Sequence, residues 1–485
     1  MPAQSPSPAR NAWGENPLLL GGEIFRPQAA LRAIWLALLA LSAFAASAQD
    51  LTLVTLDPGH FHAALLQKSM YPDVDPTVHV YAEEGPELAD YLQKIESYNT
   101  RAEAPTAWRM QVHAGTDFLD RFSADRAGDF VVIAGNNRRK AEFVTRAVAA
   151  GMNVLADKPM AIDTAGFESL RRAFADAEAR GVLLYDIMTE RHEITTMLQK
   201  VFSRIPAVFG ELLRGSEQEP AVVKESVHHF SKRVSGAPVK RPAWFFDVAQ
   251  QGEGLVDITT HLVDLVQWEC FPEEILDFSR DFRILGAKRW PTVISPAQFA
   301  QVTQLTGYPG FLAKDVRPDG SLHTYANGEI DYCIRGVHAK VSVLWNFEAP
   351  PGAGDTHYSV LRGSKANLVI RQGAAEAHQP VLYIEPVGGA DAPGFVAALE
   401  QALSRVREAY PGVDAKRAGD RWQVVVPASY HVGHEAHFAQ VAAGFLACVA
   451  KGALPAWEVP GMIAKYRLTT RALEIARGNP PMRTQ

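Results

Sequence analysis

The sequence predicts an α/β domain with a doubly wound parallel sheet, followed by an α+β domain with a large, mostly antiparallel sheet. In the first part, short apolar strands alternate with amphipathic helices, which is typical of a parallel sheet covered by helices on both faces. Beyond residue 191 the strands become longer and alternate apolar with polar residues, which indicates a sheet with one covered face. We therefore expect the first domain over 49–190 and the second over 191–485.

The first domain contains recognisable strands rich in β-branched residues. They are predicted over 51–56, 78–82, 130–134, 153–156 and 182–186. Helical patterns follow over 61–70 and 139–150, and Asp163 begins a longer helix that ends near Gly181. Open α/β sheets bind ligands outside the carboxyl ends of their strands, so the turns after these strands are the first candidates for a site.

The second domain is less regular in sequence. Its clearest strand is 337–345, where apolar and polar residues alternate, and shorter ones are predicted over 381–384 and 422–426. The segments 286–330 and 386–420 carry Gly, Pro and polar residues, and we interpret them as insertions.

Charge and cysteine content exclude two classes of function. The chain of 485 residues has a net charge of -6, whereas a nucleic-acid-binding protein needs a basic face to displace counterions from phosphates. Cys270, Cys333 and Cys448 lie far apart and form no Cys-x-x-Cys motif, so no zinc-knuckle pattern is present. They could form one disulfide at most, and we interpret them as small buried apolar residues.

Residues 1–48 are interpreted as a signal peptide with an N-terminal extension. Arg32 precedes the apolar run 33–41, and Ala46-Ser47-Ala48 supplies a small-residue cleavage site. The apolar run is shorter than the roughly 20 residues that a membrane-spanning helix needs. We therefore expect cleavage after Ala48 and an exported, periplasmic protein without a stable membrane anchor.

The turn after the first strand is a candidate phosphate-binding turn. It runs from Asp57 to His62 at the start of the β/α pattern, but it holds a single glycine where the G-x-G-x-x-G pattern has three. Glycines in that pattern let the backbone approach a pyrophosphate, whose charge a helix N-terminus receives. Glu83 or Glu84, at the end of the second strand, could accept the ribose hydroxyls of NAD, although solvated loop glutamates explain them equally well.

Two further motifs carry residues suited to proton and hydride transfer. Lys158 follows the fourth predicted strand, where it could bond a nicotinamide or a substrate hydroxyl. The segment 252–264 places Asp257, His261 and Asp264 on one face of a helix. Histidine is well suited to move a proton near neutral pH, and a carboxylate can orient it. Alone, an Asp-x-x-x-His pair is more often a structural ion pair.

Together these motifs resemble those of the Gfo/Idh/MocA family, named for glucose-fructose oxidoreductase and inositol dehydrogenase. That family has an N-terminal Rossmann domain, a Glu-Lys-Pro motif after the fourth strand and a Gly-Gly-x-x-x-Asp-x-x-x-His helix in a C-terminal sheet domain. Residues 157–159 resemble the first motif, with Asp in place of Glu, and 252–264 resemble the second. Residues 185–191 resemble the segment that leads into the substrate domain. The chain looks closest to a branch with its own C-terminal oxidoreductase domain, which shares the Pro-Gly-His-Phe-His turn.

The resemblance implies an NAD(P)-dependent oxidoreductase that acts on a CH–OH group of a carbohydrate, glycoside or polyol. It implies Lys158, Asp257 and His261 as catalytic residues, with His261 as the acid/base. The residues expected to contact substrate are Arg191, Asp264 and His229. Those expected to contact the cofactor, NAD or alternatively NADP, are Pro58, Gly59, His60, Phe61, Glu83, Asn136, Asp157 and Lys158. No metal is expected, and a homo-oligomer is plausible from the resemblance alone.

Export raises the question of how the cofactor is recycled. Outside the cytoplasm there is no ready pool of free NAD, so we expect the cofactor to stay tightly bound. One alternative is an NAD-dependent glycoside hydrolase or lyase that oxidises the sugar transiently. A second is a non-catalytic carbohydrate-binding protein. His431, His434 and His437 could hold a metal, but residues spaced by three do not stay on one face of a helix. Separately, the segment 355–357 could reach a sugar.

Overall fold

The computed structural model describes residues 51–234 and 237–478. The predicted signal peptide therefore lies outside the described residues. Within the described ranges, no helix combines the length and the apolar character needed to cross a membrane. The cysteines in this part of the chain are free thiols: Cys333 and Cys448 are buried, and Cys270 is partly buried.

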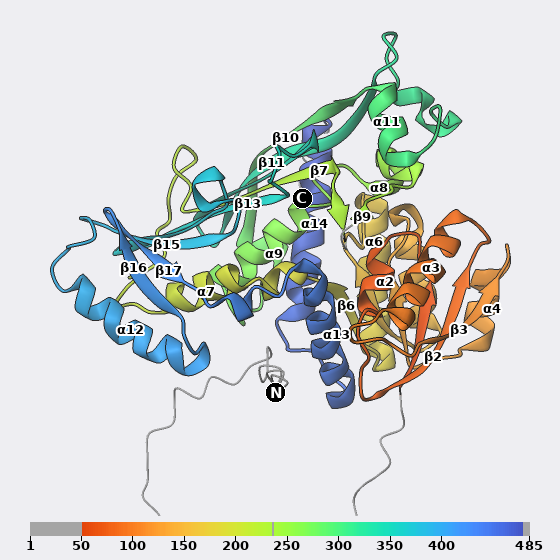
Figure 1. The fold of residues 1–485 in the computed structure, drawn as a ribbon, viewed down its shortest axis with the longest axis horizontal. Helices are drawn as coiled ribbons and strands as arrows, with labels where there is room; N and C mark the ends of the chain where they lie inside the picture. Colours follow the sequence, from red (N-terminus) through yellow and green to blue (C-terminus); the bar gives the residue numbers. More distant parts are fainter. Residues whose placement is uncertain (1–50, 235–236, 479–485) are drawn as a thin grey trace, which may run out of the picture.

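The described N-terminal region forms the predicted doubly wound domain. Its six-stranded parallel sheet has the order β3-β2-β1-β4-β5-β6 and is flanked by helices (Figure 1). The strands are β1 Leu51–Leu56, β2 Val74–Ala82, β3 Arg109–Ala114, β4 Phe130–Ile133, β5 Asn153–Asp157 and β6 Leu184–Ile187. The helices are α2 His62–Leu66, α3 Pro86–Thr100, α4 Phe118–Asp125, α5 Lys140–Ala149 and α6 Thr164–Arg180. The order reverses beside β1, which places a ligand crevice between the ends of β1 and β4.

The edge strand and the first helix of this domain differ from the prediction. Strand β3 was not predicted, because it lies at the sheet edge, pairs only with β2 and exposes much of its polar sequence, R-M-Q-V-H-A. The helix predicted over 61–70 ends at Leu66 and is only five residues long. An edge strand has one hydrogen-bonded neighbour and needs no continuous apolar run, so its sequence signal is weak.

The second domain is built on a mostly antiparallel sheet, as predicted. In the described part of the chain it has nine strands, in the order β10-β11-β12-β7-β13-β14-β15-β17-β16, and only β12 and β7 pair in parallel. The strands are β7 Val222–Ser231, β10 Phe282–Ile294, β11 Leu322–Ile334, β12 Val337–Glu348, β13 Thr356–Arg362, β14 Ala366–Arg371, β15 Val381–Pro386, β16 Asp414–Ala418 and β17 Arg421–Val425. Helices α7 Ile194–Ser203, α9 Thr259–Cys270 and α12 Phe395–Ala409 lie along one side of the sheet (Figure 1).

The interpretation of 286–330 and 386–420 as insertions is wrong. The first segment supplies most of β10 and β11, which pair over almost their full length, with helix α11 Pro296–Thr303 between them. The second segment contains α12 and β16. Gly286 and Pro291 obscured β10 in the sequence, because the pairing with β11 is irregular between Ile284 and Gly286 and between Trp290 and Thr292.

The last two long helices return to the first domain. Helices α13 His434–Lys451 and α14 Glu458–Ala476 contribute Phe438, Phe445 and Tyr466 to the hydrophobic cluster that also contains β1, β4, β5 and β6. The ring of Phe445 lies 6.3 Å from that of Phe130 and 6.4 Å from that of Tyr185. The core of the Rossmann domain therefore includes residues far beyond the boundary expected at 190.

We predict that Phe445→Ala destabilises both domains together. Phe445 is fully buried, so its removal should lower the free energy of unfolding by about 3–5 kcal/mol. The measurement is chemical denaturation followed by both near- and far-UV circular dichroism. Val387→Ala, at a side chain that is 60% exposed, is the control and should change stability by less than about 0.5 kcal/mol. A stable first domain that survives unfolding of the second would contradict the shared core.

Candidate active site

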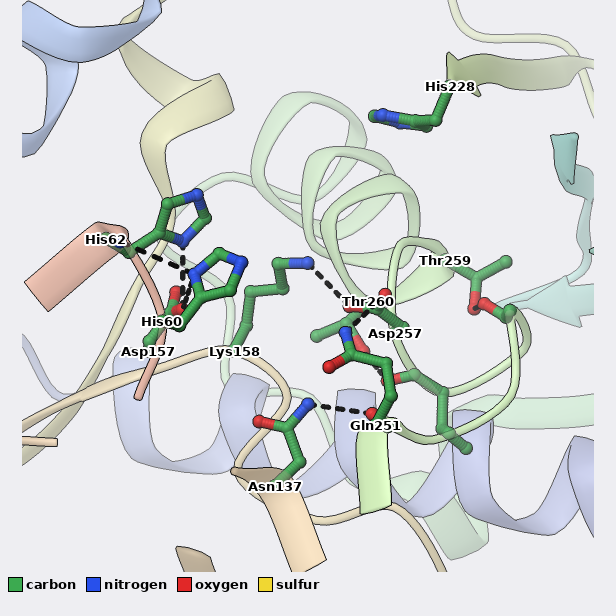
Figure 2. A network of polar contacts seen from close by, with 12 residues as sticks. His60, His62, Asn137, Asp157, Lys158, His228, Gln251, Asp257, Thr259 and Thr260 are labelled. Atoms are coloured by element: carbon green, nitrogen blue, oxygen red, sulfur yellow. Dashed lines mark hydrogen bonds and ion pairs between the residues drawn. The ribbon is translucent and has the colours of Figure 1, made fainter. Parts of the chain in front are cut away.

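A cavity of about 840 Å³ lies between the carboxyl ends of the Rossmann strands and the second sheet. Its size is within the range typical of small-molecule sites. Side chains from both domains line it, among them His60, Asp157, Lys158, His228, Asp257 and His261. Figure 2 shows His60, Asp157, Lys158, His228 and Asp257 around the start of α9.

Lys158 and Asp257 form a buried ion pair in this cavity. Lys158 follows β5 and Asp257 precedes α9, and the Lys158 Nζ lies 2.7 Å from the Asp257 Oδ1. The other carboxylate oxygen accepts a hydrogen bond from the Gln251 side-chain amide at 3.0 Å (Figure 2). Both oxygens of Asp257 are therefore engaged, and the carboxylate holds the ammonium group in place.

Glycine at the start of α9 lets the helix approach the sheet. Gly252 has a positive φ of 94°, and a Cβ on Gly254 would lie 2.0 Å from the carbonyl oxygen of Ala326 in β11. This close approach brings His261, in the first turn of α9, to the cavity wall. The glycines of this Gly-x-Gly segment therefore allow the segment before α9 to pack closely against β11.

His261 is a neutral imidazole in this environment. Burial, followed by the nearby Lys158 charge, lowers the pKa of His261 well below its ordinary value. Its Nδ1 is buried without a hydrogen-bond partner among the described residues. A neutral imidazole can accept a proton. The three residues predicted to be catalytic, Lys158, Asp257 and His261, therefore line one cavity together with a possible proton acceptor among them.

Arg191 and Asp264 do not line the cavity. The Asp264 carboxylate accepts hydrogen bonds from Arg191 Nε at 2.6 Å, Arg191 Nη2 at 2.7 Å and Lys465 Nζ at 2.7 Å. Arg191 also bonds Glu458 at 2.7 Å, and Lys465 lies 2.8 Å from Asp186. All these groups are buried, so the geometry does not support the substrate roles predicted for Arg191 and Asp264.

The opposite wall of the cavity carries a polar cluster from β7. His228 lines the cavity, whereas the predicted His229 is buried and its Nδ1 lies 3.1 Å from Asp355. The same carboxylate lies 3.1 Å from His228 Nδ1 and 2.6 Å from Lys232 Nζ. Both imidazoles contact this carboxylate, but of the two histidines only His228 lines the cavity. The prediction of His229 is therefore corrected to His228.

In the turn after β1, backbone amides donate hydrogen bonds to carbonyl groups of the same chain. Gly59 donates to the carbonyl of Asp57 at 2.8 Å, and His60 donates to the carbonyl of Ala134 at 3.0 Å. Asp57 has a positive φ of 49°, and burial raises its pKa to about 6. A turn arranged in this way does not supply the glycine cradle that a pyrophosphate normally occupies.

The predicted cofactor residues divide into two groups. His60, Phe61, Asp157 and Lys158 line the cavity, whereas Pro58, Gly59, Glu83 and Asn136 do not. Asn136 donates to the side-chain oxygen of Gln250 at 2.8 Å, and Glu83 is exposed, 4.0 Å from Arg139. The cavity thus reaches the Lys158 end of the Rossmann crevice and not the Glu83 end.

Two family matches together account for most of the described chain. Residues 79–185 match the family described as "Oxidoreductase family, NAD-binding Rossmann fold", and residues 198–477 match "Putative oxidoreductase C terminal domain". A crystal structure titled "putative oxidoreductase" from Parabacteroides merdae is 53% identical, covers 89% of this chain and 98% of its own, and superposes with a TM-score of 0.87. The chain belongs to the Gfo/Idh/MocA oxidoreductase family. The predicted family, its branch and NAD(P)-dependent oxidoreduction are thereby confirmed.

More distant members of the same fold have been solved with ligands. Levoglucosan dehydrogenase in complex with NADH and levoglucosan is 14% identical, with a TM-score of 0.56, and covers 89% of this chain and 98% of its own. A 3-ketoreductase from Actinomadura kijaniata, in complex with TDP-benzene and NADP, is 16% identical with a TM-score of 0.50 and covers 88% and 97%. At these identities the likeness shows the fold. A search of curated protein sequences finds no match.

The cavity of this Gfo/Idh/MocA protein fits the reactive end of a nicotinamide cofactor. It offers the Lys158 ammonium group as a hydrogen-bond donor and positive charge, together with the imidazole of His261, which also lines the cavity. These groups would hold the nicotinamide and the reacting carbon, while the diphosphate would need contacts other than a glycine turn. The residues therefore fit the cofactor where chemistry occurs.

Sequence reasoning missed several cavity residues. His62 and Glu190 line the cavity and were not predicted, and His434 lines it although it was considered only as part of a metal pattern. The alternation of His60 and His62 was a usable signal, since it is uncommon at a turn where glycines are expected. Glu190 follows β6 and offered no such signal.

We predict that Asp264→Asn lowers stability and leaves substrate affinity unchanged. Removing one charge of a buried network leaves its partner charges buried and uncompensated, which lowers the free energy of unfolding by about 3–5 kcal/mol. The measurement is the free energy of unfolding, together with KM of the folded protein once a substrate is known. Asp414→Asn, which breaks an exposed pair with Arg407, is the control and should cost less than about 1 kcal/mol. An unchanged stability with a raised KM would restore the substrate role.

Proposed function

We propose that this protein oxidises a CH–OH group of a carbohydrate, glycoside or polyol with a tightly held NAD(P) cofactor. The observation that carries the proposal is the convergence of Lys158, Asp257 and His261 on one cavity. The NADH and NADP complexes of the distant relatives support the choice of cofactor, and the levoglucosan bound to one of them supports the substrate class.

Three residues of the cavity have different roles in the proposed oxidation. A bound nicotinamide supplies the hydride acceptor. His261, kept neutral by burial, accepts the hydroxyl proton as the carbon loses its hydride. Lys158 donates a hydrogen bond to the same substrate oxygen and stabilises the negative charge that develops on it. Asp257 positions the Lys158 ammonium group, which it contacts at 2.7 Å.

The far wall suits a sugar ring. His228 and Asp355 present polar groups to the cavity, and Trp345 and Phe245 supply aromatic surface there. The ring of His228 stacks on that of Trp345 with centroids 5.1 Å apart. Hydrogen-bonding groups beside an aromatic face match the hydroxyls and the apolar C–H face of a carbohydrate.

Export through the N-terminal segment belongs to the same proposal. Its pattern of Arg32, an apolar run and Ala46-Ser47-Ala48 supports a periplasmic location. A resident cofactor would then have to be reoxidised in place. A redox-neutral reaction, in which a glycoside is oxidised, cleaved and reduced again, meets this requirement without a second substrate, and it is the alternative within the same site.

We predict that the mature protein purified from the periplasm releases about one NAD or NADP per molecule on denaturation. Mass spectrometry of the released nucleotide is the measurement. Turnover of a glycoside without an added acceptor would favour the redox-neutral alternative. A folded protein that holds no nucleotide and binds none when NAD is added would overturn the proposal in favour of a non-catalytic carbohydrate-binding protein.

We predict that His261→Ala lowers the rate of alcohol oxidation by about 10²- to 10⁴-fold, because the proton acceptor is lost. NADH formation followed by absorbance is the measurement, and circular dichroism checks the fold. His323→Ala is the matched control, since His323 lies on β11 and does not line the cavity. Full activity of a folded His261→Ala variant would remove His261 from the mechanism.

A further inference from the structure

We propose that His60, His62 and Asp157 bind a divalent transition-metal ion at the foot of the cavity, a site that goes beyond the redox function proposed above. One ligand atom from each residue can be chosen so that all lie within 4.8 Å of one another. His62 Nδ1 lies 2.9 Å from Asp157 Oδ2, and His60 Nδ1 lies 3.8 Å from the same oxygen. Figure 2 shows the two imidazoles converging on this carboxylate.

The donor set is that of known transition-metal sites. Two imidazole nitrogens and one carboxylate oxygen bind zinc in hydrolytic enzymes and non-haem iron in oxygenases. The histidines must be neutral to offer a lone pair, and burial lowers the pKa of both His60 and His62 well below the ordinary value. Their side chains are 14% and 12% exposed and that of Asp157 is 6% exposed, so a bound ion would be largely shielded from water.

The fold builds the cluster at the place where a dinucleotide turn normally has glycine. Asp57, Gly59 and His62 occupy the first, third and sixth positions of the G-x-G-x-x-G spacing, so an imidazole replaces the third glycine. Asp157 comes from the end of β5, separated from β1 in the sheet by β4. A turn that has lost its phosphate cradle has therefore gained a set of metal ligands.

The neighbouring charges leave the carboxylate available. Lys158 is paired with Asp257 rather than with Asp157, at 2.7 Å. Lys140 donates to the backbone carbonyl of Asp157 at 2.9 Å and to the side chain of Asn137. Neither ammonium group occupies the oxygen that faces the two imidazoles.

The ion would keep coordination positions open to the cavity. All three proposed ligands line the same cavity as Lys158 and His261. His434, whose ring lies 6.2 Å from that of His62, has its Nδ1 3.5 Å from Glu190 and is not required as a ligand. With only three protein ligands, water or a substrate oxygen would complete the coordination, as in catalytic metal sites.

The test is titration of the chelator-treated full-length chain with Co²⁺, without nucleotide, followed by visible absorption and by competition with Zn²⁺. We expect one Co²⁺ per chain with ligand-field bands that Zn²⁺ abolishes. His62→Gln and Asp157→Asn should each weaken Co²⁺ binding at least tenfold. Because no nucleotide or turnover is involved, the result is independent of the oxidoreductase proposal.

The control is His113→Ala, which disrupts the pair of His79 and His113 outside the cavity, 3.1 Å apart and without a carboxylate ligand. It should leave the Co²⁺ affinity and spectrum unchanged. Thermal melts establish whether each variant is folded. If His62→Gln does not fold, His60→Gln replaces it as the ligand variant. A folded wild-type chain without a Co²⁺ spectrum, or equal binding by wild type and ligand variants, would show that His62 and Asp157 form a structural hydrogen bond only.

Discussion

The buried ion network around Asp264 and Lys465 is the constraint on which the site depends. It joins Asp186 at the end of β6, Arg191 in the connection between the domains, and α9 and α14. Removing these charges from water is costly, and only their mutual contacts offset that cost. The network therefore fixes α9, which carries His261, against the carboxyl edge of the Rossmann sheet.

Once α9 is fixed, the rest of the site follows from short contacts. Asp257 lies where Lys158, at the end of β5, can reach it, and glycine before α9 allows the helix to pack on β11. Helix α13 contributes Phe445 to the hydrophobic core of the first domain. The active-site cavity is thus bounded by segments from the beginning, middle and end of the chain.

The turn after β1 shows how a shared fold can change its chemistry. In a dinucleotide-binding turn, glycine amides face a diphosphate. Here two of these amides are used inside the chain, and imidazole side chains occupy the space beside Asp157. The general dinucleotide-binding glycine pattern therefore does not describe this turn, whereas the family motifs describe the reactive end of the site.

The sequence by itself determined the fold class, the family and the residues that meet at the reactive end. Alternation of strands and helices, and motifs at fixed spacing around Lys158, Asp257 and His261, are local signals, and these were sufficient. Only the tertiary structure decided the pairing of β10 with β11, because β10 is an irregular edge strand whose sequence carries little periodicity. It likewise decided that Arg191 and Asp264 are buried ion partners and that His228, not His229, faces the cavity. The tertiary structure also decided the grouping of His60 and His62 with Asp157, because the turn after β1 and the end of β5 come together only in the folded sheet.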